Sequence, residues 1–187
     1  MLAEHGVQFV AVDPQIDDGL LREPPEVLPD VWAGSLAYLK AQAAVRVAHQ
    51  SKLALASGCV VLGADTVVVK DKRLLGKPKD AAHAAKMLML LSGGSHRVVT
   101  GIALVCPQTG RRTITSESAE VTVGALSDEQ ISGYVSGGQW AGKAGGYNLF
   151  DRVAAGWPIS WQGDPTAIVG LPMGTLLRAL RRWSATV

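Results

Sequence analysis

Residues 60–78 read VVLGADTVVVKDKRLLGKP, and this stretch decides how the fold is interpreted. Two apolar runs flank the acid Asp65 and the hydroxyl of Thr66, and the chain then turns before it reaches Lys77, which lies between a glycine and a proline. The pattern predicts a hairpin of two strands. A carboxylate within a valine-rich strand is costly to bury unless a charged partner or a metal compensates it. The stretch therefore predicts a functional site that includes Asp65 and Lys77.

The segments on both sides of this stretch mix helical and strand patterns. Strand composition occurs at residues 7–12 (VQFVAV), and two long β-rich runs at 96–123 are joined by a turn at 107–110. Apolar side chains repeat at helical spacing in residues 31–50 and after Asp80, which is a candidate N-cap. Because strands and helices do not alternate regularly, we predict an α/β fold with a mixed, mostly antiparallel twisted sheet flanked by helices.

Length and composition set limits on the class of protein. A chain of 187 residues with 48% apolar residues predicts one globular domain over 1–187. The net charge of +2 gives no argument for a nucleic-acid partner, and no apolar run approaches the roughly 20 residues that span a membrane. The N-terminus lacks the pattern of a signal peptide, so we expect a cytoplasmic protein. Cys59 and Cys106 are predicted to be buried free thiols; a disulfide between them is the alternative, although no pattern supports it.

The charged residues next to glycines suggest one kind of chemistry. Asp65 and Asp18 offer carboxylates, whereas Lys77 and Lys143 offer flexible cations, and Lys143 lies in the glycine-rich segment 142–147 (GKAGGY). Carboxylates, a hard divalent ion and lysines together are suited to binding and cleaving a polyphosphate. Asp17 is a further candidate carboxylate. The alternatives are that Asp17 and Asp18 only cap a turn and that the glycines form an ordinary connection. The sequence contains no dinucleotide-binding glycine motif, no P-loop and no cysteine–histidine metal pattern.

Motifs spread over nearly the whole chain resemble those of the Maf family. They are GADTVV at 63–68, LGKP at 75–78, HRVVTG at 96–101, KAGGY at 143–147 and VGLP at 169–172. The resemblance implies a nucleoside triphosphate pyrophosphatase that releases a nucleoside monophosphate and pyrophosphate. It also implies the fold of the inosine-triphosphate pyrophosphatases, a divalent cation (Mg²⁺ or Mn²⁺), a cytoplasmic homodimer, and a role in clearing non-standard or modified nucleotides.

The resemblance also assigns roles by position. It implies that Asp65 is the catalytic proton acceptor and a metal ligand, that Thr66 contributes to base specificity, and that Lys77 faces the phosphates. The glycines around Lys143 suggest that this lysine contacts the phosphates as well. Asp18 matches a position that contributes to metal binding, where the family usually has glutamate.

This chain departs from the family pattern at several points. In place of a helix lysine it has Ala43, and Lys40 one turn earlier or Arg46 one turn later could reach the same space. Where the family has a base-selecting glutamine the chain has Phe150, so a uracil or thymine preference has no support from this position.

The start of the chain is the largest departure. The family begins with a strand and a Ser-x-Ser-Pro-Arg-Arg loop that grips the triphosphate, and this chain starts at Met1 after that point, so we expect an N-terminally truncated Maf-like domain. One account is that the chain was begun at an internal methionine of a longer enzyme. The other is that it lacks the loop and is a catalytically weakened nucleotide-binding or regulatory protein.

Overall fold

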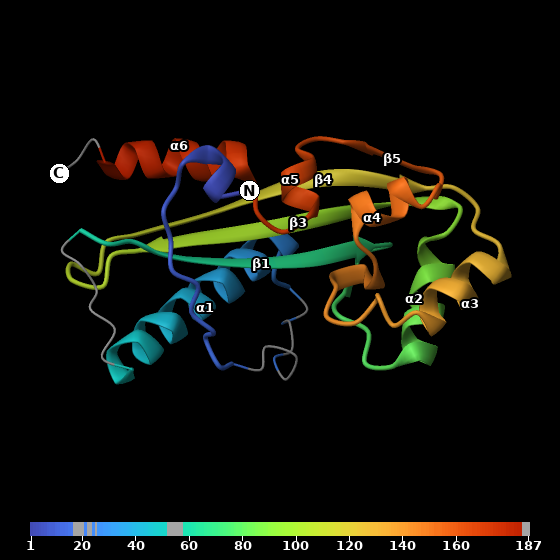
Figure 1. Ribbon diagram of the computed structural model, residues 1–187, viewed down its shortest axis with the longest axis horizontal. Coiled ribbons are helices and arrows are strands. Elements are labelled where there is room, and N and C mark those ends of the chain that lie inside the picture. The colour runs from blue at the N-terminus through green and yellow to red at the C-terminus, as the bar shows by residue number, and fades with distance from the viewer. Residues whose placement is uncertain (17–20, 22–23, 25, 52–57, 185–187) are drawn as a thin grey trace. The chain divides into compact units, whose positions relative to one another are not determined.

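The computed structural model describes residues 1–16, 21, 24, 26–51 and 58–184 of the chain (Figure 1). It confirms the predicted mixed α/β class, with a five-stranded sheet in the order β2-β1-β3-β4-β5. The strands β1 and β2, and likewise β4 and β5, pair antiparallel. The strands are β1 (Val61–Lys70), β2 (Arg73–Leu75), β3 (Gly94–Val105), β4 (Arg112–Val123) and β5 (Ile159–Gln162). The helices are η1 (Ala3–His5), α1 (Pro29–Gln50), α2 (Ala81–Leu91), α3 (Asp128–Ser136), η3 (Ala144–Gly146), α4 (Leu149–Ala154), α5 (Pro165–Ile168) and α6 (Met173–Ser184).

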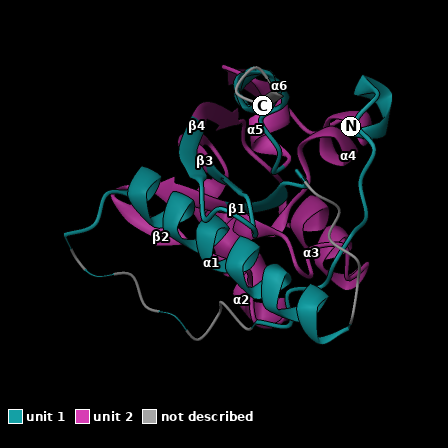
Figure 2. Cartoon of the chain, turned by 90° about the vertical axis from the view of Figure 1, so that its left-hand side faces the viewer, with its two compact units in different colours: residues 1–65, 100–117, 170–187 teal, residues 66–99, 118–169 magenta. Residues whose placement is uncertain are grey.

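The chain forms two compact units, which Figure 2 shows in different colours. Unit 1 consists of residues 1–65, 100–117 and 170–187, and unit 2 of residues 66–99 and 118–169. The long strands β1, β3 and β4 contribute residues to both units. Asp65 is the last residue of unit 1 in β1, and Thr66 is the first residue of unit 2.

In unit 1, the strands present alternate residues to two helices, as the two-residue period of a strand requires. Leu62, Ile102 and Leu104 pack with α6, whose Leu176 is completely buried. Val61 and Ala103 face the other way and pack with Ala37 and Ala41 of α1. The two helices therefore bury opposite faces of the same strands. Leu39 belongs to the apolar repeat of residues 31–50 that predicts a buried helix face, but it is 37% exposed, because small alanines occupy the buried face of α1.

In unit 2, one apolar cluster lies among α2, α3 and the strands and includes Leu88, Val121 and Trp157. Helix α2 begins where the sequence predicts, since the Asp80 side chain accepts a hydrogen bond from the His83 backbone N–H at 2.7 Å. Helix α3 begins with a capping box formed by Ser127 and Gln130. Local side-chain signals thus fix the helix starts of this unit.

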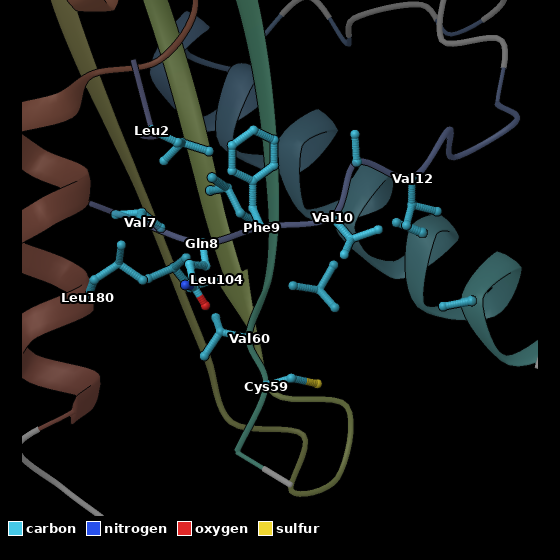
Figure 3. A pocket seen from close by; sticks show the side chains of 15 residues that line it. Leu2, Val7, Gln8, Phe9, Val10, Val12, Cys59, Val60, Leu104 and Leu180 are labelled. Atoms are coloured by element: carbon cyan, nitrogen blue, oxygen red, sulfur yellow. The ribbon is translucent and has the colours of Figure 1, made fainter. Parts of the chain in front are cut away.

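The predicted strand at residues 7–12 is not present. This segment has neither helix nor strand structure after η1, although it is rich in β-branched residues. A strand needs a hydrogen-bonded neighbour, and strand composition alone does not supply one. The segment instead lines an apolar pocket together with the residues before and at the start of β1 and with Leu104 and Leu180 (Figure 3). Among the described residues, no helix is long and apolar enough to cross a membrane.

Candidate active site

Two glycines allow helix α1 to approach the strands of unit 1 at backbone distance. A Cβ atom at Gly63 of β1 would lie 2.1 Å from the carbonyl oxygen of Ala37 and 2.8 Å from the backbone nitrogen of Ala41. A Cβ atom at Gly101 of β3 would lie 2.3 Å from the carbonyl carbon of Ala33. Only glycine leaves room for such an approach. Gly63, the first residue of the GADTVV motif, therefore has a packing role, because it allows the backbone of α1 to lie close to the backbone of β1.

This close approach brings Lys40 to Asp65. Gly63 and Asp65 are two residues apart in β1, so they point to the same face of the strand, and Lys40 lies between Ala37 and Ala41 in sequence on α1. The Lys40 ammonium donates a hydrogen bond to Oδ1 of Asp65, and the two groups form an ion pair. The lysine predicted as a substitute for the family's helix lysine thus reaches the predicted catalytic acid.

The environment of Asp65 explains how a carboxylate is tolerated in an apolar strand. Its side chain is only 7% exposed, whereas that of Lys40 is 19% exposed. Burying a charge is tolerable when an opposite charge and hydrogen bonds compensate the lost hydration. Because the Lys40 ammonium contacts the carboxylate directly, it compensates the charge of Asp65 and fixes the orientation of its oxygen atoms. A carboxylate held in this way can accept a proton or bind a hard cation.

Lys77 and Lys143 lie in unit 2, and their segments are joined by the backbone. Lys77 follows β2 and is exposed, and the Gly145 N–H donates a hydrogen bond to the carbonyl oxygen of Gly76 at 3.1 Å. Gly145 and Gly146 have φ angles of 72° and 79°, a conformation that favours glycine. The predicted glycine-rich segment is therefore a defined turn beside the segment that carries Lys77. The Lys143 ammonium donates to the carbonyl oxygen of Gln139 within this region.

A buried histidine–tyrosine pair supports this turn. This contact was not predicted from the sequence. His96 of β3 and Tyr147, which follows the turn, are hydrogen-bonded between Nε2 and the hydroxyl at 2.7 Å. Burial, with a smaller contribution from the Lys70 cation, lowers the pKa of His96 from 6.5 to about 4. Burial also raises the pKa of the Tyr147 hydroxyl. Both side chains are thus uncharged near neutral pH, and the pair anchors the residue next to the glycines.

The remaining predicted site residues are placed as follows. Thr66 is half-buried and points to the opposite face of β1 from Asp65. Arg46 is exposed near the end of α1. Asp17 and Asp18 lie outside the described residues, and within those residues no group of three or more His, Cys, Asp or Glu side chains could hold a metal. Phe150 is 47% exposed and packs edge-on against Trp161, with ring centroids 6.4 Å apart.

Comparison with known proteins gives a consistent result. A family model described as "Maf-like protein" matches residues 1–183. The chain is 39% identical over 181 residues to a dTTP/UTP pyrophosphatase of Caulobacter vibrioides, an alignment that covers 96% of this chain and 87% of that protein. It is 38% identical over 183 residues to a dTTP/UTP pyrophosphatase of Symbiobacterium thermophilum, covering 98% and 87% respectively.

Another relative matches over a shorter region. A dTTP/UTP pyrophosphatase of Bacillus cytotoxicus is 43% identical over 127 residues, which cover 67% of this chain and 64% of that protein. In this alignment the chain spans a little less than two thirds of the length of its relative.

Proposed function

The chain belongs to the Maf-like protein family, and from this premise we propose that it hydrolyses nucleoside triphosphates to the monophosphate and pyrophosphate. The observation that carries the proposal is the buried Asp65 carboxylate, held by Lys40 within the GADTVV strand. A single oriented base of this kind suits the activation of a water molecule. Relatives named dTTP/UTP pyrophosphatase support the same reaction class.

In the proposed reaction Asp65 accepts a proton from the attacking water. The water oxygen forms a bond to the α-phosphorus, the bond from this phosphorus to the bridging oxygen breaks, and pyrophosphate leaves. Lys40 has two roles in this scheme, because its ammonium orients the carboxylate and can also contact a phosphate oxygen. Its position on α1, at the carboxylate, supports both.

Lys77 and Lys143 are the proposed phosphate ligands of unit 2. Their segments are adjacent through the Gly145–Gly76 hydrogen bond, and backbone N–H groups in a glycine turn with positive φ can approach an anion closely. The proposed role of Thr66 is contact with the substrate. The names of the relatives make dTTP and UTP the first substrates to test.

We also propose a divalent cation, Mg²⁺ or Mn²⁺, as the cofactor. The carboxylate of Asp65 is a hard oxygen donor that suits these ions, and Mg²⁺ commonly binds through one or two carboxylates together with substrate phosphates. Asp18 is the proposed second carboxylate. When bound, the cation would neutralise charge on the phosphates. A cytoplasmic homodimer that binds neither nucleic acid nor membrane completes the proposal.

The experiment measures pyrophosphate release by the purified chain from a panel of ordinary and modified nucleoside triphosphates, with Mg²⁺ or Mn²⁺. We expect turnover by the native chain and a loss of at least about 100-fold in Asp65→Asn, because a general base contributes roughly that much or more. Glu120→Gln, which removes an exposed carboxylate from β4, is the matched control and should keep full activity. Nucleotide binding without turnover by the native chain would contradict the proposal.

A further inference from the structure

The two cysteines lie at neighbouring positions in unit 1, although they are far apart in the sequence. Cys59 comes shortly before β1, and Cys106 comes directly after β3, the neighbour of β1 in the sheet. Both are free thiols, as the sequence predicts, but the prediction that both are buried is wrong for Cys59, which is half-buried. Neither belongs to the proposed pyrophosphatase machinery. Their proximity is therefore a separate feature of the fold.

A single side chain contacts both sulfur atoms. The Cys106 thiol donates a hydrogen bond to Oε1 of Gln108 at 3.3 Å, and Nε2 of the same carboxamide donates to the sulfur of Cys59 at 3.7 Å. The two sulfur atoms are therefore separated by no more than one carboxamide group and its two hydrogen bonds. Rotation of the Gln108 side chain would remove the group that lies between them.

Contacts within the turn after Cys106 lower the pKa of its thiol. It is closed by hydrogen bonds from the Cys106 N–H to the Arg111 carbonyl and from the Gly110 N–H to the Cys106 carbonyl, both 2.9 Å long. Hydrogen bonds from the Thr109 side chain and backbone, a further backbone hydrogen bond from Gln108 and the Arg111 cation lower the pKa of the Cys106 thiol. A thiolate is the nucleophile in thiol–disulfide chemistry, so the turn prepares Cys106 to attack an oxidised sulfur.

Cys59 is the more accessible of the two thiols. It is half-buried and lines the apolar pocket beside Val60, where its side chain is visible in Figure 3, whereas Cys106 is only 9% exposed. A small oxidant such as hydrogen peroxide would therefore meet Cys59 first. Redox-sensing cysteines are commonly solvent-accessible and lie next to a second cysteine that resolves the oxidised form.

We propose that Cys59 and Cys106 form a peroxide-sensitive thiol pair that closes reversibly to a disulfide. In the first step the Cys59 sulfur is oxidised by hydrogen peroxide to a sulfenic acid, the O–O bond breaks, and water is released. In the second step the Cys106 sulfur attacks the Cys59 sulfur, the S–O bond breaks, and hydroxide leaves and takes up the proton of the Cys106 thiol. The sum is two thiols and one peroxide giving one disulfide and two waters.

The test treats the reduced chain with hydrogen peroxide and follows the products by intact mass and by non-reducing peptide mapping. We expect a monomer lighter by about 2 Da, a Cys59–Cys106 cross-linked peptide, and full reversal by dithiothreitol. In Cys106→Ser the Cys59 sulfenic acid has no partner, so a sulfenic-acid trap should label it, whereas the native chain should stay unlabelled. Cys106→Ser is nearly isosteric with the native chain, and circular dichroism checks that it is folded.

A second variant tests the role of the bridging carboxamide. Gln108→Ala removes the group between the sulfur atoms and should accelerate disulfide closure several-fold, whereas Gln50→Ala, an exposed substitution at the end of α1, should not. The proposal is overturned if peroxide yields only cross-linked dimers, only sulfinic acid, or no change in the thiols. It is equally overturned if the cross-link forms only in urea, where the fold no longer holds the pair together.

Discussion

Lys40 of α1 and Asp65 of β1, 25 residues apart in the sequence, form an ion pair in which the carboxylate is almost fully buried. Lys40→Met removes the ammonium group that contacts Oδ1 of Asp65. Because an unpaired buried carboxylate is costly, we expect a loss of about 2 kcal/mol in the free energy of unfolding, less than for a fully buried pair since Lys40 is partly exposed. Urea denaturation measures this loss, and Lys86→Met on the exposed face of α2 is the control.

The double variant Lys40→Met/Asp65→Asn separates the pair from its members. With both charges removed, we expect a stability closer to that of the native chain than the sum of the two single losses, with a coupling of about 1–3 kcal/mol. The same denaturation measurements provide the complete cycle. Strictly additive losses would show that the two side chains do not interact.

Gly63 should tolerate no side chain. Gly63→Ala places a methyl group against the backbone of α1, which cannot shift as a flexible side chain can, so we expect a loss of about 3 kcal/mol in the free energy of unfolding. Gly133→Ala is the matched control, because nothing lies within 4 Å of the added methyl group on α3, and it should stabilise the chain by about 0.5–1 kcal/mol. Thermal and urea unfolding compare the two variants.

His96 should make stability depend on pH in the acidic range. The unfolded chain binds a proton on this residue below pH 6.5, whereas the folded chain does so only below about 4. Stability is therefore complete above pH 6.5 and falls as the pH decreases from 6.5 to about 4, by on the order of 3 kcal/mol.

Variants of two histidines test this pH dependence. His96→Gln should flatten the curve of unfolding free energy against pH in this window, whereas His49→Gln, on the exposed end of α1, should leave it unchanged. An identical slope in the native chain and in His96→Gln would refute the assignment.

Lys77 and Lys143 should act on substrate binding more than on the chemical step. We expect Lys77→Met and Lys143→Met each to raise KM by about tenfold or more, since a hydrogen bond to a charged group contributes roughly 1.5–3 kcal/mol. Steady-state kinetics at several salt concentrations measure the effect, with Lys86→Met as the matched exposed lysine. An unchanged KM in both variants would remove these residues from the proposed phosphate site.

The local signals in the sequence predict helix starts and turns well. Asp80 and the Ser127–Gln130 box act through side chains three residues apart, and the turn after Cys106 closes the β3–β4 hairpin as expected. The strand predicted at 7–12 was wrong because strand formation depends on a neighbour that composition does not reveal.

Contacts between residues far apart in the sequence were harder to predict. Lys40 was one of two candidates to reach the space of the family's helix lysine, and only the depth of α1 on Gly63 brings its ammonium to Asp65. The contact between His96 and Tyr147 joins residues that are 51 positions apart in the sequence. In the sequence, His96 is simply a polar residue within a predicted strand. A periodicity rule cannot distinguish such a buried histidine from one exposed on the sheet.

The backbone contact at Gly63 has a consequence for engineering this chain. Helix α1 contacts the strands through main-chain atoms at Gly63 and Gly101. The distance between the helix and the strands therefore cannot be adjusted by changing the size of side chains at that contact. The reach of the cation at position 40 is consequently a matter of side-chain length alone. Libraries that aim to change the activity should vary position 40 with Lys, Arg and Gln and keep glycine at positions 63 and 101. Any other residue at position 63 or 101 would displace α1 before it changed the chemistry of the site.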